Sequence, residues 1–271
     1  MLRIHIIGLL LSLTLSACAR HAPHIQTPSW EVNDLARPQP PRITPGEFST
    51  QDRPGTPPSD AVVLFDGHDL SHWRGEKGEP QWLVNAGVLE IKPHSGSIAT
   101  KESFGDCQLH IEWQTPPEVK GAGQARGNSG VFLMSLFEVQ VLDTHENRTY
   151  ADGMAGSIYG QYPPIVNAAG PAGQWQVYDI LFRRPRVNAN GTIATPAIMT
   201  VLFNGVVVQD HMKLIGPTNH HILATWQPPI PTTGPLMLQD HGAVVRYRNI
   251  WIRNLPEEKE VAPIRASSTK E

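Results

Sequence analysis

The stretch FEVQVLDTHEN, residues 137–147, alternates between apolar and polar side chains. Phe137 and Val139 are apolar, whereas Glu138 and Gln140 are polar. Successive side chains of a β-strand point to opposite faces of the sheet. The stretch therefore predicts a strand that turns one face to an apolar core and presents a carboxylate and an amide on the other. That polar row is either a solvated surface or the floor of a site.

Asp143 lies five residues after Glu138, so a regular strand would place its side chain on the opposite face. A single bulge between residues 140 and 143 would return it to the face of Glu138 and Gln140. The alternative is that Asp143 only begins a turn with Thr144 and His145. The two interpretations are compatible, because sites are often built at strand ends.

The chain between residues 60 and 255 is rich in similar short segments. Of 271 residues, 25 are proline and 23 are glycine, which favours short strands joined by turns. The predicted strands are 61–65, 107–113, 129–143, 174–182, 199–208 and 244–254, with hairpin turns at 85–87 and at Asn204-Gly205. Such a pattern predicts an all-β sandwich of two antiparallel sheets.

The N-terminus has the features of an export signal. Residues 1–17 combine Arg3 with an apolar run too short for a good membrane span. Small residues before Cys18 resemble a bacterial lipobox, so we expect lipidation of Cys18 and a membrane contact through that anchor. The alternative is an ordinary signal peptide cleaved after Ala17. Ala19 after the cysteine is similar to an outer-membrane sorting signal, which predicts an exported protein held in the envelope, facing the periplasm.

Two flanking segments are unlike the predicted domain. Residues 18–59 are rich in proline and poor in large apolar residues, which predicts an extended tether. Residues 256–271 are charged or small and are expected to be a flexible tail. Cys107 alternates with Leu109 and Ile111, so we expect a buried, inert thiol.

Several function classes lack support. The formal net charge is −3, and there is no basic stripe of the kind that nucleic-acid binders carry. No dinucleotide fingerprint, P-loop or zinc-ligand spacing is present, and nothing indicates an oligomeric state. Oxygen-rich loops of sandwiches can hold Ca²⁺ or another divalent metal, but no run of alternating Asp and Asn defines such a site.

A set of short motifs resembles the 3-keto-disaccharide hydrolase family. They follow the family's order along the chain and are specific only together. They are 64–67 (LFDG), 128–132 (NSGVF), 137–143 (FEVQVLD), 156–159 (GSIY), Trp175, 203–205 (FNG), 234–242 (GPLMLQDHG) and 245–250 (VRYRNI). The sequence departs from the family at Gln176, where an Asn usually follows Trp175, and in a longer insert at 184–197.

The resemblance implies a concanavalin A-like jelly-roll sandwich that acts on a carbohydrate substrate. In the implied reaction, a ketone at C3 of a glucoside acidifies the C2 proton, a base removes it, and the C1 leaving group departs by elimination. Water then adds to the enone, so that the net result is hydrolysis. This route needs a base, an acid and donors for the enolate.

The resemblance and the residue types together suggest roles. Glu138 is the candidate base, and Asp143 or His241 the candidate acid. The candidates for substrate binding are Asn128, Gln140, Trp175, Gln239 and Arg246. Arg248 shares a face with Arg246 and could take its place, and both could simply solvate an outer strand.

Two other functions stay open. A laminarinase-type retaining glucanase would need two carboxylates about 5 to 5.5 Å apart, which Glu138 and Asp143 could supply across a bulge. The related glucanases usually carry a further carboxylate where this chain has Gln140. A non-catalytic carbohydrate-binding module would use the polar row and Trp175 without turning the sugar over.

Overall fold

The computed structural model describes residues 30–257. Residues 41–257 form one compact unit, whereas residues 30–40 belong to a separate one, in which Asp34 Oδ1 accepts a hydrogen bond from the Ala36 backbone N–H (2.8 Å). The expected signal peptide, Cys18 and most of the C-terminal tail lie outside the described residues. Within the described residues no helix has the length and apolar character to cross a membrane.

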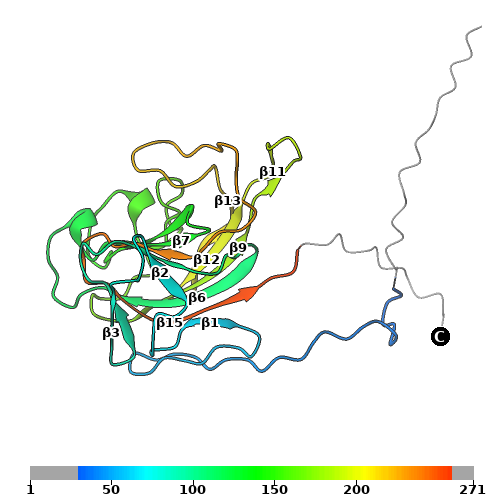
Figure 1. Cartoon of the computed structure of the whole chain (residues 1–271), viewed down its shortest axis with the longest axis horizontal. Helices are drawn as coiled ribbons and strands as arrows, with labels where there is room; N and C mark the ends of the chain where they lie inside the picture. Colours follow the sequence, from blue (N-terminus) through cyan, green and yellow to red (C-terminus); the bar gives the residue numbers. More distant parts are fainter. Residues whose placement is uncertain (1–29, 258–271) are drawn as a thin grey trace, which may run out of the picture. The chain divides into compact units, whose positions relative to one another are not determined.

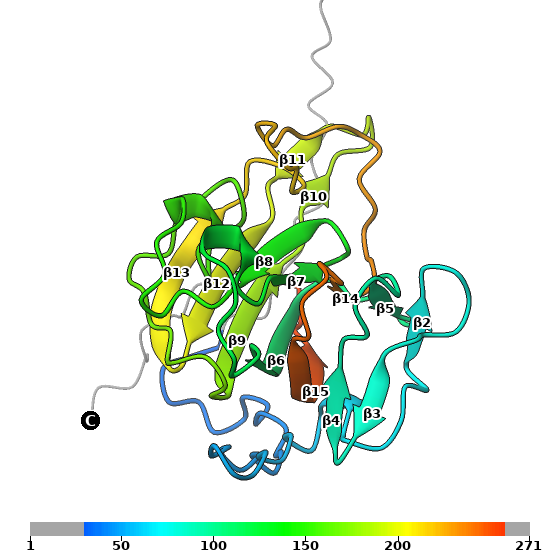
Figure 2. The same ribbon diagram turned by 90° about the vertical axis from the view of Figure 1, so that its left-hand side faces the viewer.

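The compact unit is an all-β jelly-roll sandwich of two antiparallel sheets with a concanavalin A-like fold, as the sequence predicted (Figures 1 and 2). The larger sheet has the strand order β13-β12-β9-β6-β15-β4-β3, with β1 paired to β15. Its strands are β1 (Val62–Phe65), β3 (Leu83–Asn85), β4 (Val88–Glu90), β6 (Cys107–Gln114), β9 (Gln176–Arg183), β12 (Ile198–Phe203), β13 (Val206–Lys213) and β15 (Arg246–Asn254).

The smaller sheet has the order β2-β5-β14-β7-β8. Its strands are β2 (Trp73–Gly75), β5 (Ile98–Thr100), β7 (Ser129–Leu133), β8 (Phe137–Val141) and β14 (Met237–Leu238). The insert forms a separate hairpin of β10 (Arg186–Val187) and β11 (Ile193–Thr195). Two short 3₁₀ helices, Gly123–Ala125 and Ala151–Gly153, complete the regular structure.

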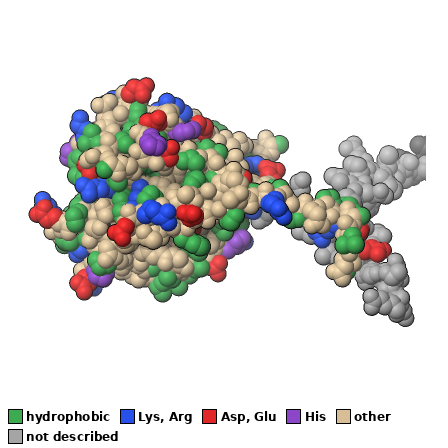
Figure 3. Space-filling view, turned by 90° about the horizontal axis from the view of Figure 1, so that it is seen from below, with side chains coloured by type: hydrophobic (Ala, Val, Ile, Leu, Met, Phe, Trp, Pro, Cys, Tyr) green, Lys and Arg blue, Asp and Glu red, His purple; other side chains and the backbone are tan. Residues whose placement is uncertain are grey.

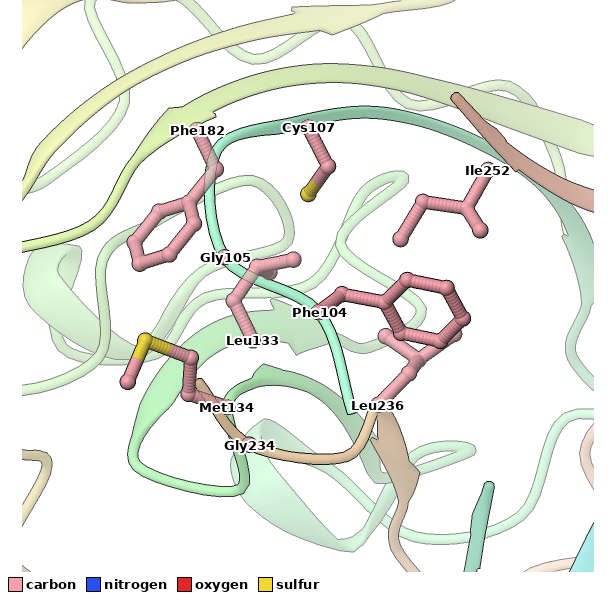
Figure 4. Close-up of a pocket in the computed structure, with 9 residues that line it drawn as sticks. All are labelled: Phe104, Gly105, Cys107, Leu133, Met134, Phe182, Gly234, Leu236 and Ile252. Atoms are coloured by element: carbon pink, nitrogen blue, oxygen red, sulfur yellow. The ribbon is translucent and has the colours of Figure 1, made fainter. Parts of the chain in front are cut away.

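The core lies between the two sheets because alternate residues of each strand point inward. In β6, Cys107, Leu109 and Ile111 are buried, and in β8 Phe137 and Val139 are buried. Burial raises the pKa of the Cys107 thiol to about 12, so this cysteine is the inert core residue that was expected. It borders a gap lined by apolar side chains that has no room for a water molecule, so we do not consider the gap a site (Figure 4).

The region predicted as one strand from 129 to 143 is instead a hairpin. β7 and β8 pair antiparallel, and Met134 and Ser135 between them both have φ of 55°. Positive φ at both central residues is the mark of a type I′ turn, which normally contains Asn and Gly. The turn at Asn204-Gly205 has that usual chemistry, with φ of 51° and 78°, and it joins β12 to β13 as predicted.

A bulge in β15 changes which side chains face outward. Its register with β6 shifts between Arg248 and Trp251, and Asn249 has φ of 47°. As a result Tyr247 and Ile250 are both buried in the core. Arg248 belongs to the other face, where its guanidinium Nε donates to Glu112 Oε2 (2.7 Å).

Residues 44–59, here called the N-terminal loop, differ from the extended tether expected over 18–59. The loop folds back on itself, with hydrogen bonds from Ser59 N–H to the Thr44 carbonyl (2.9 Å) and from Thr56 N–H to the Glu47 carbonyl (3.2 Å). It lies against the outer face of the larger sheet, beneath β15 and β1 in Figure 1. Proline limits its conformations, while its polar backbone supplies the contacts.

The contacts of the N-terminal loop converge on a buried ion pair. The Ser49 hydroxyl donates to Glu112 Oε1, and Arg248 donates to the Thr50 (2.5 Å) and Gln51 (3.3 Å) carbonyl oxygens. The Glu112 side chain is fully buried and the Arg248 side chain is 6% exposed. The loop thus satisfies charged groups that the sandwich alone would leave partly unpaired.

Charge elsewhere on the surface is mixed. Figure 3 shows acidic, basic and histidine side chains interspersed on the face that it displays. This agrees with a formal net charge of only −3 for the whole chain.

The N-terminal loop should be needed for full stability. A chain that begins at residue 60 should have a free energy of unfolding lower by about 3 kcal/mol than one that begins at residue 41, because it loses three hydrogen bonds to buried charged groups. Urea denaturation of the two chains measures the difference. Equal midpoints would show that the loop only rests on the surface.

Candidate active site

The polar row of β8 lies on the outer face of the smaller sheet. Phe137, Val139 and Val141 are fully buried in the core, so Glu138 and Gln140 point the other way. In the ladder between the strands, Glu138 lies opposite Phe132 and Gln140 lies opposite Gly130 of β7. The register with β7 is regular up to Val141, where β8 ends, so Asp143 lies beyond the strand and the bulge considered between 140 and 143 is not part of this ladder.

Glu138 is a buried carboxyl group with no ion-pair partner among the described residues. Its side chain is only 4% exposed, and this desolvation raises its pKa to about 8. It leans toward Gly130, where a Cβ atom would collide with Glu138 Oε1 and lie 2.7 Å from Phe132 Cε2. Glycine at position 130 is therefore what makes room for the carboxylate.

Gln140 connects Glu138 to its neighbours. With its NH₂ group turned toward β7, its amide donates to the Ser129 carbonyl (2.8 Å) and to Glu138 Oε1 (3.2 Å). In this orientation the side-chain oxygen of Gln140 lies 2.9 Å from the side-chain amide of Gln124. Asn128 in turn donates from Nδ2 to the Gln124 carbonyl (3.0 Å) and to Gln124 Oε1 (3.2 Å). Glu138 is thus positioned by a network of neutral amides.

A segment beyond β8 adds residues that the sequence analysis missed. Ile158 bridges Val139, and Tyr159 N–H donates to the Glu138 carbonyl (3.2 Å), so Tyr159 lies opposite Glu138. Ile158 is buried in the core, and alternation turns Tyr159 and Ser157 to the outer face. The Ser157 hydroxyl is buried and has no hydrogen-bond partner among residues 30–257.

The Tyr159 hydroxyl belongs to a small polar cluster. It lies 2.7 Å from the Tyr150 hydroxyl and 3.0 Å from His220 Nδ1. Burial and the Tyr150 hydrogen bond both raise the pKa of Tyr159, so its hydroxyl stays protonated at neutral pH. Tyr159 lines a cavity of about 370 Å³ together with Asp152 and Asn219.

A second cavity, of about 860 Å³, collects three of the predicted residues. Asn128, Asp143 and His241 all line it, and Gln124 and Arg126 contribute to the same wall. Gln124 also contacts Gln140, which connects the wall of this cavity to the polar row of β8. Glu138 itself lines neither cavity; it is connected to the larger one through the contact of Gln140 with Gln124, and to the smaller one through its backbone hydrogen bond with Tyr159.

Asp143 is paired with Arg126 inside the larger of these cavities. The Arg126 guanidinium donates to Asp143 Oδ2 through Nε (2.9 Å) and through its terminal NH₂ group, and His145 N–H donates to Asp143 Oδ1 (3.2 Å). Asp143 thus starts a turn, and its carboxylate acts as an acceptor. It is one side of an anchored ion pair that shapes the cavity wall.

Gln239 lies across β7 from Gln140. Its backbone N–H donates to the Gly130 carbonyl (3.0 Å), which continues the β14–β7 pairing by one residue. Its side-chain oxygen Oε1 is buried and has no hydrogen-bond partner within the described part of the chain. With Ser157 on the other side of Gln140, two unpaired polar atoms flank the floor near Glu138. Unpaired buried polar atoms are costly, and a bound polar ligand would satisfy them.

Two predicted substrate-binding residues lie elsewhere. Arg246 is on the outer face of the larger sheet, where its Nε donates to Glu90 Oε2 (2.6 Å). Trp175 precedes β9, and its ring carries the Arg248 guanidinium 4.2 Å from the ring centroid. It lines a third cavity, next to the N-terminal loop. The structure does not bring either residue together with Glu138.

The described residues contain no group of three or more His, Cys, Asp or Glu side chains arranged to hold a metal ion. The side chains around the polar row are one carboxyl group with a raised pKa, several amides, a tyrosine and two histidines.

Comparisons with known proteins relate this geometry to a family. A family described as the 3-keto-alpha-glucoside-1,2-lyase-like domain matches residues 60–253. A crystal structure from Parabacteroides distasonis ATCC 8503, described as a "putative glycosyl hydrolase", is 40% identical, with a TM-score of 0.78, and the alignment covers 84% of this chain and 100% of that one.

Two further structures from Parabacteroides distasonis carry the same description. They are 20% and 22% identical to this chain, with TM-scores of 0.54 and 0.52, over 73% and 72% of this chain and 94% and 99% of theirs. At that identity they support the fold alone. A search of curated proteins found no match. The extent of the family match and the 40% identical structure show that the chain belongs to the 3-keto-alpha-glucoside-1,2-lyase-like family, whose function is carbohydrate-active and of the glycosyl hydrolase type.

Proposed function

We propose that this protein cleaves the glycosidic bond of 3-keto-glycosides by ketone-assisted elimination, with Glu138 as the general base. The observation that carries the proposal is the environment of Glu138. Its carboxyl group is buried among amides, has no ion-pair partner within residues 30–257, and has a pKa of about 8. A carboxylate of that kind is a stronger base than an exposed one and is suited to removing a proton from carbon.

The reaction proceeds in three balanced steps. Glu138 removes the C2 proton, and the electron pair delocalises onto the C3 ketone oxygen as an enolate. The enolate electrons then form a double bond between C1 and C2, and the bond from C1 to the leaving oxygen breaks. An acid gives a proton to that oxygen, so the aglycone is released as an alcohol. Water adds to C1 of the enone and C2 takes a proton, so that the sum is hydrolysis of the glycosidic bond.

The neighbouring groups suit the other requirements of this route. The Gln239 amide lies beside the polar row, where its NH₂ group can donate to the ketone oxygen or to hydroxyl groups, whereas the NH₂ group of Gln140 already donates to Ser129 and Glu138. Asn128 lines the larger cavity, where its side-chain amide can bind a hydroxyl group of the sugar. The proton donor to the leaving group is His241 or Tyr159, since Asp143 is held as an acceptor by Arg126.

A retaining glucanase is less well supported by this geometry. That mechanism needs a second carboxylate within about 5.5 Å of the first. A charged neighbour so close would itself raise the pKa of Glu138. Burial is the only cause of the Glu138 shift, and Asp143 faces Arg126.

We also propose that the protein acts in the bacterial envelope, held by a lipid on Cys18. The support for this comes from residues 1–19 of the sequence alone. Fractionation of cells that express the whole chain tests it. Recovery in the membrane fraction is expected, and recovery of all the protein in the soluble fraction would contradict the anchor.

Replacing the base should abolish turnover without unfolding the protein. In Glu138→Gln, kcat for a 3-keto-glucoside should fall by about 10²- to 10⁴-fold, because the amide cannot accept the C2 proton. The unoxidised parent glucoside should not be cleaved by either protein. Product release measured by chromatography, with urea denaturation as a check of folding, provides the data.

Other results would redirect the assignment. Equal turnover of the ketone and of its parent would indicate ordinary glycosidase chemistry. Full activity of Glu138→Gln would remove Glu138 from the reaction. Binding of both sugars with turnover of neither would identify a binding module.

The pH dependence should report the raised pKa of Glu138. A base must be deprotonated to act, so kcat/KM for the 3-keto-glucoside should rise with pH through about 8 and then level off, instead of rising near 4.5. Initial rates between pH 5 and pH 10, corrected for spontaneous elimination, give the profile. A decrease through pH 8 would mean that Glu138 acts as the proton donor.

A further inference from the structure

The third cavity, of about 920 Å³, lies between the N-terminal loop and the outer face of the larger sheet. Its floor includes Val177, Asp179 and Leu181 of β9, which alternate with the core residues Tyr178 and Ile180. The cavity thus opens on the side of the sandwich opposite to the smaller sheet that carries Glu138. None of the steps proposed for catalysis uses it.

Three aromatic rings line this cavity, namely Trp175, Trp251 and Phe48. Trp251 is stacked on His110, with ring centroids 5.0 Å apart and planes 8° from parallel. Trp175 is held by the Arg248 guanidinium over its ring and by two hydrogen bonds between its backbone and the Gln51 side chain (2.8 and 2.9 Å). Both indoles are therefore fixed in orientation before any ligand arrives.

Phe48 is the least expected of the three rings. Its side chain is 95% exposed on the N-terminal loop, at the edge of the cavity. Exposure on that scale contributes nothing to the stability of the fold, since burial of apolar area is what stabilises it. An exposed ring at the mouth of a cavity that already contains two indoles is placed to contact a ligand.

Planar polar groups share the cavity with these rings. Asp179 Oδ1 accepts a hydrogen bond from His110 (2.7 Å), whereas its Oδ2 makes no hydrogen bond within the described residues. The side chain of Gln174 is exposed at the same rim. Carboxylate and amide groups can each bind two neighbouring hydroxyl groups of one ring. Small-ligand sites in proteins have this volume and this combination of apolar surface and few polar groups.

The composition of the cavity selects the class of ligand. A lipid tail would bury Asp179 and Gln174 against hydrocarbon, which is unfavourable. The charged walls are of both signs, and the two basic groups are already paired, Arg253 with Asp60 and His110 with Asp179, so they favour no anionic polymer over a neutral ligand. A sugar ring has apolar C–H faces for the aromatic rings and hydroxyl groups for the planar polar side chains.

We propose that this cavity is a second, non-catalytic binding site for a neutral oligosaccharide. It stands on its own lining residues and does not require that Glu138 act as a base. The N-terminal loop forms one wall of the site, so the segment that precedes the sandwich supplies part of the ligand contacts.

Binding measurements on an inactive protein test the proposal. Glu138→Gln should be screened against an array of neutral gluco-, xylo- and galacto-oligosaccharides, and the best ligand titrated by calorimetry. Adding Phe48→Ala should raise Kd at least fivefold, because the ligand loses its contact with this ring. The fold should not change, because removal of an exposed ring leaves no hole. Leu83→Ala, at an exposed apolar side chain (49%) that lines none of the three cavities described above, is the control and should leave Kd unchanged.

Two further readouts separate this site from the catalytic one. Indole N–H signals of Trp175 and Trp251 should shift on titration, and Phe48→Ala alone should keep wild-type turnover of a 3-keto-glucoside. Lack of binding across the array, or binding that neither Phe48→Ala nor Gln174→Ala weakens, would overturn the proposal. Because the probes are unoxidised sugars and the readout is affinity, failure here is distinguishable from failure of the proposed reaction.

Discussion

The strict alternation of β8 is the constraint on which the site depends. Phe137, Val139 and Val141 are all fully buried between the sheets, and a shift of register by one residue would exchange them for Glu138 and Gln140. Such a slip would bury a carboxylate and an amide in the core at a cost of several kcal/mol. The same apolar residues that stabilise the sandwich therefore fix the direction of the polar row. Core packing positions the candidate base without any dedicated loop.

The raised pKa of Glu138 follows from its surroundings, which have a glycine on the neighbouring strand and neutral amides beside the carboxyl group. Gly130 provides no side chain opposite Gln140, and Glu138 uses the space. No cation from the described part of the chain accompanies the carboxylate, so desolvation is not offset and the pKa rises. Asp143, only a short way along the same chain, has the opposite surroundings because Arg126 neutralises it. Two carboxylates of one segment thus differ in their surroundings, since one faces neutral amides and the other a guanidinium.

Sequence pattern was informative where local rules decide the structure. The alternation of 137–141, the Asn204-Gly205 turn and the core position of Cys107 all follow from period and turn chemistry. Asn128, Asp143 and His241, which the family resemblance gives as site candidates, all line one cavity. Roles for these residues are a matter for experiment.

The features that sequence did not indicate depend on tertiary contacts. Met134 and Ser135 adopt a turn that their side chains do not favour, because the pairing of β7 with β8 imposes it. Positions in β15 could not be assigned to a face without knowing of the bulge at Asn249. Tyr159 gave one available signal, since it ends the family motif 156–159, but no pattern places it opposite Glu138.

The largest difference between the sequence-based expectation and the structure is at residues 44–59, which fold onto the larger sheet. Their composition resembles that of a flexible tether, and propensity alone gives no reason for them to fold. The reason lies in the larger sheet, where Glu112 and Arg248 occupy adjacent strands and are buried only when something covers them. Glu112 also accepts a hydrogen bond from Asn249 (2.7 Å), so the bulge in β15 contributes to the same cluster.

This arrangement gives the sandwich two differently built faces. On the smaller sheet the Glu138 carboxylate has no counter-ion among the described residues, and burial raises its pKa. On the larger sheet Glu112 is surrounded by Arg248, Asn249, Ser49 and His110, and these hydrogen bonds lower its pKa despite burial. The second carboxylate is therefore fixed as an anion and serves to hold the N-terminal loop. The apolar core between the sheets separates Glu112 from Glu138. The N-terminal loop can therefore form one wall of the third cavity without changing the surroundings of the candidate base, Glu138.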